Sequence, residues 1–170
     1  PHGLSTPHCY DVIVDGGADD DISMAMYLKK NPGTAQHQSG TPVDVWVTSP
    51  SRSSHKSLMK FSRPIYVPVS VSVKIKDDGT LPPNAADLVK DAYMEYASGE
   101  LTATACGFRQ GGFDIGQSVP YTAMYVPANK VIGQFGYAYV TEMTLNGMSA
   151  DIPIAYNELS QWSINTITVE

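Results

Sequence analysis

The sequence contains few of the residues on which redox, disulfide or charge-based functions depend. Its 170 residues include two cysteines, Cys9 and Cys106, which is too few for a disulfide framework and typical of a protein made in a reducing compartment. Charged residues make up 16% of the chain, compared with about a quarter in an average soluble domain. No apolar run is long enough to span a bilayer. We therefore expect neither a disulfide scaffold nor a membrane-spanning segment.

Positive charge is also scarce. The chain has 11 lysines and arginines against 17 aspartates and glutamates, which gives a net charge of −6. No basic stripe interrupts this balance, so we expect no nucleic-acid partner. The sequence starts at Pro1 and carries no recognisable signal peptide, from which we expect a processed or deliberately cut fragment.

Tyrosine and methionine are the residues that the chain has in quantity. It contains ten tyrosines, seven methionines and two tryptophans, and these three types are enriched at protein interfaces. A tyrosine-rich core would explain the same composition, so both interpretations remain open. The candidate interface residues are Trp46, Tyr66, Tyr137, Tyr139 and Tyr156.

Residues 1–62 are expected to form a small β-α-β-β domain. We expect strands over 9–14, 43–48 and 56–61, a helix over 19–30 and a loop over 33–42. The helix is predicted because acids stand in its first turn and Lys29 and Lys30 in its last, where each charge opposes the helix dipole. The strand over 43–48 is predicted because valine alternates there with other residues, and a turn cluster at 49–54 makes the third strand its hairpin partner.

Residues 63–170 are expected to form a second domain. Apolar residues recur at every second position from Ile65 to Ile75, which predicts one long strand over 65–76 with Pro68 at an edge or a bulge. The other expected elements are a helix over 84–98, a helix from about 118, and strands over 137–145, 150–155 and 163–169. Asn146-Gly147 predicts a two-residue hairpin turn, and 100–113 has no clear assignment. The order predicts a ferredoxin-like sheet with two helices on one face, so the fold class is α+β.

Three groups of residues could carry chemistry, and each has a simpler explanation. Asp19, Asp20 and Asp21 could bind Mg²⁺ or Ca²⁺, but consecutive helical residues point in different directions, and stabilisation of the helix N-terminus explains them better. His2, His8 and Cys9 are zinc-ligand types without a zinc spacing. The glycine-rich stretch 107–116 lacks the ending of a phosphate loop. We therefore predict no catalytic residue, metal ligand or cofactor, and no enzyme.

Three ordered stretches resemble one protein family. The first is Asp15-Gly16-Gly17-Ala18-Asp19-Asp20-Asp21-Ile22 with the helix that follows. The second is Phe61-Ser62-Arg63-Pro64 with the alternating strand after it. The third is Asp151-Ile152-Pro153-Ile154-Ala155-Tyr156-Asn157-Glu158-Leu159. Together they resemble the baseplate J-like family of contractile-tail bacteriophages (Mu/P2 type), in which they are a Gly-Gly-Asp-Asp element, a crossing between segments, and a turn before the last strand.

The resemblance implies a structural subunit of the baseplate wedge, in the virion and assembled in the host bacterial cytoplasm. Its implied partners are other copies of itself and other wedge proteins, in a ring around the hub, and it implies no active site. The family's N-terminal region has no counterpart here, so this would be the C-terminal fragment of a longer protein. A receptor- or carbohydrate-binding tail module is the alternative, because Trp46 could stack on sugars. A cell-wall hydrolase is a third interpretation, which would need a pair of carboxylates in a cleft.

Overall fold

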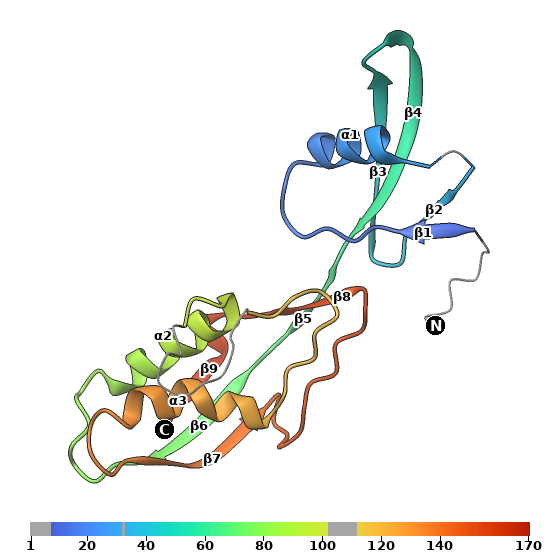
Figure 1. The fold of residues 1–170 in the computed structure, drawn as a ribbon. Coiled ribbons are helices and arrows are strands. Elements are labelled where there is room, and N and C mark those ends of the chain that lie inside the picture. The colour runs from blue at the N-terminus through green and yellow to red at the C-terminus, as the bar shows by residue number, and fades with distance from the viewer. Residues whose placement is uncertain (1–7, 32, 102–111) are drawn as a thin grey trace. The chain divides into compact units, whose positions relative to one another are not determined.

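The computed structural model describes residues 8–31, 33–101 and 112–170 and has an α+β fold, as the sequence predicted. The chain divides into two compact units, Pro1–Ile65 and Tyr66–Glu170 (Figure 1). The domain boundary was predicted after Ser62, and the units divide after Ile65. Each unit is described by itself below.

The N-terminal unit is built from a long hairpin, one helix and a short pair of strands. In chain order its elements are β1 (Cys9–Asp11), α1 (Asp19–Lys29), β2 (Ala35–His37), β3 (Thr41–Ser49) and β4 (Arg52–Arg63). β3 and β4 pair antiparallel over their whole length, whereas β1 and β2 form a parallel pair. α1 packs against the hairpin. Buried Val47, Met59 and Phe61 form the apolar centre of this unit.

β1 ends at Asp11, before the predicted end of its strand, and β4 begins at Arg52, inside the predicted turn. β2 was not predicted at all, because 33–42 was expected to be a loop. Three residues, Ala-Gln-His, carry no alternating apolar pattern that would predict a strand. The strand pairs with β1, and a side chain also holds it in place. Gln36 Oε1 accepts a hydrogen bond from the backbone N–H of Lys60 (2.9 Å), and Gln36 Nε2 donates to the Tyr10 hydroxyl (2.8 Å).

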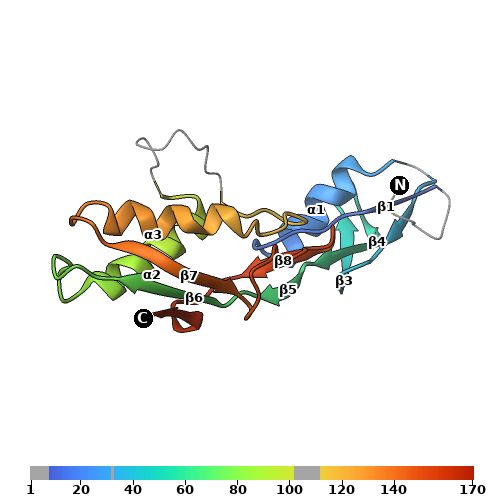
Figure 2. The ribbon, with the colours of Figure 1, turned by 90° about the horizontal axis from the view of Figure 1, so that it is seen from below.

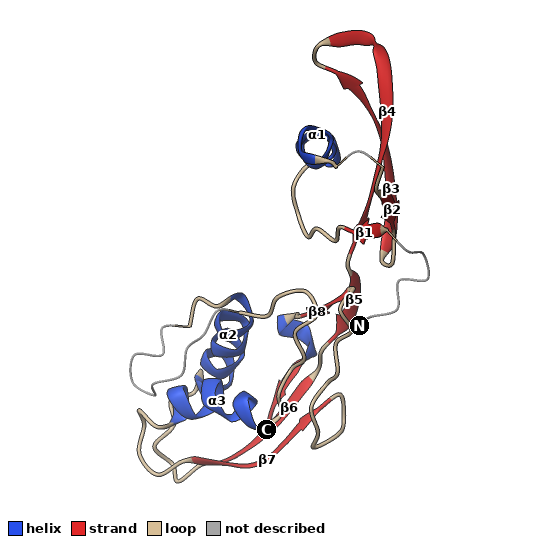
Figure 3. Ribbon diagram, turned by 45° about the vertical axis from the view of Figure 1, so that its right-hand side comes forward, coloured by secondary structure: helices blue, strands red, loops and turns tan. Residues whose placement is uncertain are grey.

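The described residues of the C-terminal unit form two small sheets, and its helices cover one face of the larger sheet. Its elements are β5 (Ile65–Pro68), β6 (Val71–Lys76), α2 (Ala85–Ser98), the short 3-10 helix η1 (Thr122–Met124), α3 (Tyr125–Ile132), β7 (Tyr139–Leu145), β8 (Glu158–Gln161), η2 (Ile164–Thr166) and β9 (Ile167–Val169). The sheet order is β7-β6-β9, and β5 pairs with β8. β6 is antiparallel to β7 and parallel to β9. Figures 1 and 3 show α2 and α3 together on one side of β6 and β7, and Figure 2 shows the same elements from below.

The two helices on one face agree with the sequence prediction, whereas the predicted ferredoxin-like connection order is wrong. In the sequence, both helices come between β6 and β7. The chain order of this sheet and its helices is therefore β-α-α-β-β (Figure 3). A ferredoxin-like unit places its two helices in separate crossovers. The core between helices and sheet includes Val71, Val89, Tyr93 and Leu145, each of them fully buried.

Two strand predictions in this unit are wrong. The strand expected over 65–76 is interrupted at Val69 and Ser70, so that β5 and β6 join different sheets. The strand expected over 150–155 is a single bridge between Ile152 and Val119, with both backbone hydrogen bonds at 3.0 Å. Pro153 follows the bridge and has no N–H to continue a ladder.

The second helix and the C-terminal strand begin later than predicted. Val119 is engaged in the bridge to Ile152, so the helical turns start at Thr122 rather than near Ser118. Pro127 lies in the first turn of α3, where its missing N–H has no helical acceptor to lose. The terminal strand expected over 163–169 contains η2 and then β9 (Ile167–Val169). β8 occupies Glu158–Gln161, where a turn was expected.

Asn146 links the interruption at Val69–Ser70 to the predicted hairpin turn. Asn146 and Gly147 both have positive φ, 50° and 76°, as a two-residue type I′ turn requires. Asn146 Oδ1 accepts hydrogen bonds from the backbone N–H (2.7 Å) and the hydroxyl (3.0 Å) of Ser70, and its Nδ2 donates to Pro68 O (3.2 Å). The Asn146 side chain therefore satisfies the Ser70 N–H and the Pro68 carbonyl at the break between β5 and β6, while the Thr166 hydroxyl donates to Val69 O (2.8 Å).

Replacement of Asn146 by alanine is expected to destabilise the C-terminal unit by about 1–3 kcal/mol, because the Ser70 N–H loses its acceptor and alanine tolerates positive φ poorly. Replacement by glycine removes the same hydrogen bonds without the backbone penalty. Urea denaturation that places Asn146→Gly between the wild type and Asn146→Ala would support this division. Equal stability of all three proteins would contradict it.

Candidate interaction surfaces

Arg63, the last residue of β4, joins segments that are distant in sequence. Its guanidinium donates to the backbone carbonyls of Val14 (3.1 Å), Gly16 and Gly17 (2.7 Å), and to Asp19 Oδ1 (2.5 Å). A planar guanidinium presents several donors in fixed directions, which suits a cluster of oxygens better than an ammonium group does. We call this arrangement the Arg63 clamp. It holds the turn between β1 and α1 against the end of the hairpin.

The clamp explains why two consecutive glycines stand in this turn. Gly16 and Gly17 have φ of +70° and +74°, a backbone region that side chains other than glycine rarely adopt. The sequence singled out these glycines as part of a Gly-Gly-Asp-Asp element. It did not predict that Arg63 would bind the carbonyl oxygens of that turn, because no spacing rule relates an arginine to carbonyls 46 and 47 positions away.

The three acids of α1 have different surroundings. Asp19 is the partner of Arg63, whereas Asp20 and Asp21 are exposed in the first helical turn. The preceding residue, Ala18, offers no capping side chain, so carboxylates near the helix N-terminus supply the favourable charge. Within the part of the chain that the structure describes, no three His, Cys, Asp or Glu side chains come together as a metal site would require.

The other groups singled out in the sequence remain apart or lie outside the described residues. His8 is exposed and Cys9 begins β1, while His2 and Cys106 lie outside the described residues. Of the glycine-rich stretch 107–116, residues 107–111 are likewise outside them. Gly112, with φ of +76°, lies directly against the backbone at the end of α2.

All five candidate interface residues are exposed on the surface. Trp46 lies on β3 of the N-terminal unit and is 65% exposed. The other four lie in the C-terminal unit, where Tyr137 reaches 89% exposure and Tyr139 is close to it at the start of β7. Tyr66 is on β5, and Tyr156 is in the turn before β8. The five residues therefore divide between the two units, and exposure alone does not assign them a partner.

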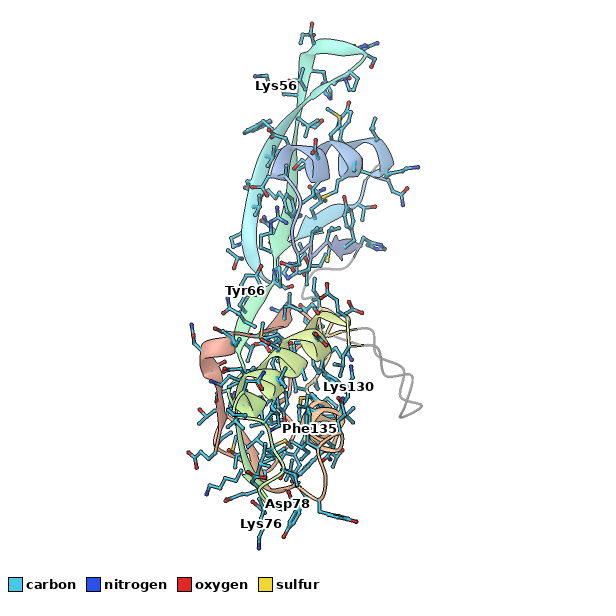
Figure 4. The ribbon with its side chains drawn as sticks, turned by 90° about the vertical axis from the view of Figure 1, so that its left-hand side faces the viewer. Lys56, Tyr66, Lys76, Asp78, Lys130 and Phe135 are labelled. Atoms are coloured by element: carbon cyan, nitrogen blue, oxygen red, sulfur yellow. The ribbon has the colours of Figure 1, made fainter. Side chains whose placement is uncertain are left out.

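Tyr137 is presented by a turn that side-chain hydrogen bonds hold in place. Its backbone N–H donates to Asp78 Oδ2 (3.1 Å), and Asp78 also accepts hydrogen bonds from Thr80. The Thr80 hydroxyl first, and then the Tyr137 N–H, lower the pKa of Asp78 below its ordinary value. Figure 4 shows Asp78 near the end of β6 that carries Lys76. An ionised Asp78 therefore anchors the turn before β7, from which the exposed Tyr137 and Tyr139 follow.

A groove of about 220 Å³ lies between α2 and α3. Asp91 and Glu95 of α2 line it together with Lys130 of α3 and Phe135, which follows that helix. Figure 4 labels Lys130 and Phe135. Glycoside hydrolysis needs two carboxylates that flank the bond to be cleaved. Asp91 and Glu95 are exposed neighbours on one helix, one turn apart, and so lie on the same side of the groove.

Comparison with protein-family models and with curated proteins finds no match for this chain. Among the described residues, no helix combines the length and the apolar character needed to cross a membrane. The Arg63 clamp and the exposed aromatic residues are therefore the features on which a functional proposal can rest.

Proposed function

We propose that this chain belongs to a structural subunit of the baseplate wedge of a contractile-tail bacteriophage, where it contacts other copies of itself and other wedge proteins around the hub. The observation that carries the proposal is the Arg63 clamp. Two of the three stretches that resemble the baseplate J-like family, Asp15 to Ile22 and Phe61 to Pro64, are distant in sequence and meet in this one contact. Two stretches that meet in one contact support the resemblance to this family better than two separate sequence matches do.

The exposed aromatic residues support an assembly role. Tyrosine and tryptophan offer large contact areas at a small cost in side-chain entropy, and they are frequent in the centres of interfaces. Trp46 and Tyr137 are 65% and 89% exposed. We propose that these side chains become buried when the subunit enters the ring of the virion.

Deletion of the region that encodes this chain, in the bacteriophage or prophage that carries it, is expected to abolish baseplate assembly. Electron micrographs of the lysate should then show capsids without complete contractile tails, and the intact gene supplied in trans should restore them. A matched control deletes a gene for a tail fibre, which should leave baseplates intact. Normal baseplates after deletion of this region would refute the proposal.

The alternative of a receptor- or carbohydrate-binding module rests on the same exposure of Trp46, because an exposed indole can stack on a sugar ring. A glycan array distinguishes the two functions. Reproducible binding of the wild-type chain to one glycan, lost in Trp46→Ser and retained in Tyr137→Ser, would favour the alternative.

A further inference from the structure

The two edges of the β3–β4 hairpin differ in how their backbone groups are satisfied. On the outer edge of β4, the Lys60 N–H donates to Gln36 Oε1 (2.9 Å). The Ser62 N–H donates to Val12 O (2.9 Å), and Ser62 O accepts from the Val14 N–H (3.0 Å). These contacts identify the even-numbered residues of β4 as those whose backbone groups point away from β3, because such groups alternate along an antiparallel strand. Figure 4 shows Lys56, another of these residues, near the end of the hairpin.

The pairing register of the hairpin shows which backbone groups of β3 also point outward. Asp44 is paired with Lys60, Trp46 with Leu58 and Thr48 with Lys56. The N–H and C=O groups of Asp44, Trp46 and Thr48 therefore point to the outer edge of β3. Among residues 8–31, 33–101 and 112–170, no strand pairs with this edge. An open edge of this kind is a template for an added strand.

Two prolines limit the open edge of β3 at equal distances in sequence from Trp46. Pro42 and Pro50 stand four positions before and four positions after Trp46. Proline has no N–H to donate to a ladder, so each proline marks an end of the stretch that can pair. The stretch between them is centred on an exposed tryptophan, and that symmetry suits a partner with the same sequence.

We propose that two copies of this chain pair antiparallel through the outer edges of β3, with the two-fold axis at Trp46. In this register Trp46 faces Trp46 of the second copy, and Asp44 faces Thr48. The two prolines face each other outside the ladder. The interface is self-complementary, as a two-fold dimer requires. The pairing rests on the proposed function and deepens it, because it names a surface through which one subunit meets another.

The side chains on the exposed face agree with this register. Leu58 lies beside Trp46 within each hairpin, so an apolar row Leu58-Trp46-Trp46-Leu58 crosses the joined sheet. Asp44 keeps its own Lys60 at 3.8 Å and faces the uncharged Thr48. An axis at Asp44 would place two carboxylates opposite each other, which is unfavourable. An axis at Thr48 would place Pro50 opposite Trp46.

Disulfide trapping tests the register directly. On a background with Cys9 and Cys106 replaced by serine, Trp46→Cys should form a covalent dimer on mild oxidation. A directly opposed hydrogen-bonded pair has Cα atoms about 5.5 Å apart, within the range of a disulfide. Asp44→Cys should not, because four residues of stagger separate the two sites by about 13 Å, whereas the double variant Asp44→Cys/Thr48→Cys should. Trapping of Asp44→Cys but not of Trp46→Cys would overturn the proposal.

Light scattering coupled to size-exclusion chromatography tests the dimer itself. The wild-type chain should dimerise as its concentration rises, and Trp46→Lys should remain monomeric at every concentration. Tyr137→Lys is the matched control, because it changes an even more exposed aromatic residue of the other unit and should leave the dimer unchanged. A wild-type chain that stays monomeric up to its solubility limit, or a Trp46→Lys variant that still dimerises, would overturn the pairing. Baseplate assembly after deletion is a separate readout, so a monomeric chain would leave the proposed function standing.

Discussion

Replacement of Arg63 by alanine is expected to destabilise the N-terminal unit by about 2–4 kcal/mol, because hydrogen bonds from a charged donor contribute more than neutral ones and several are lost together. The Arg63 side chain is 21% exposed, and its guanidinium also lies 5.3 Å from the centre of the Phe61 ring. Its loss leaves three carbonyl oxygens and Asp19 without their donor. Lysine at position 63 keeps the charge but not the planar fork, so Arg63→Lys should recover only part of the stability.

Hydrogen exchange followed by mass spectrometry measures the loss of stability in each unit separately. A loss of 2–4 kcal/mol corresponds to roughly 30- to 900-fold faster exchange of the β3 and β4 amides. Amides of α2 should be unaffected and serve as the internal reference. Lys60→Ala is the matched control, because the Lys60–Asp44 pair is 41% and 50% exposed at 3.8 Å and such pairs contribute about 0–1 kcal/mol. Equal effects of Arg63→Ala and Lys60→Ala would contradict the clamp.

Local patterns predicted most of the secondary structure of this chain. The acids and lysines of 19–30, the alternation around Val43 to Val47 and the Asn146-Gly147 turn each correspond to an element of the structure. These signals are local, because dipole, alternation and turn preferences act within a few residues. The helix predicted over 84–98 likewise ends at Ser98, with Gly99 as its left-handed C-cap.

The errors arise where tertiary contacts override a local pattern. The alternation from Ile65 to Ile75 continues through a real break, because Asn146, from a turn more than seventy positions later, satisfies Ser70 there. β2 pairs with β1, and Gln36 binds the backbone of Lys60, and no local alternation predicts either contact. The clamp was missed for the same reason. The sequence indicated that Arg63 lies at the crossing between two segments. Its contacts with Gly16 and Gly17 depend on the folded structure and could not be predicted.

Replacement of Tyr93 by alanine is expected to destabilise the C-terminal unit by about 3–5 kcal/mol, the range for a large aromatic residue removed from a core. Tyr93 is fully buried on α2, and its hydroxyl donates to Met124 O (2.7 Å) and lies 3.5 Å from Met143 Sδ. Tyr93→Phe keeps the ring and loses only these contacts, so it should cost about 1 kcal/mol. The two variants together separate the contribution of ring packing to stability from that of the hydroxyl hydrogen bond.

The two tryptophans allow this unit to be followed alone. Trp162 is stacked on Phe113 with ring centres 5.4 Å apart, so its fluorescence reports unfolding of the C-terminal unit. Urea denaturation is therefore measured on a Trp46→Phe background. A cost for Tyr93→Phe as large as that for Tyr93→Ala would show that the hydroxyl, rather than the ring, provides most of the stabilisation.

Alkaline pH provides an independent test of the same side chain. Burial first, and then the neighbouring Tyr125, raise the pKa of Tyr93 above its ordinary value of 10.0. A group whose pKa is higher in the folded state stabilises the fold fully below its unfolded pKa, and that contribution is lost as the pH rises toward the folded value. The wild-type unit should therefore lose stability above about pH 10. The hydrogen bond to Tyr121 is the first cause that raises the pKa of Tyr125, so Tyr93→Phe should reduce this slope without abolishing it. An unchanged slope in Tyr93→Phe would show that Tyr93 does not govern the alkaline limit.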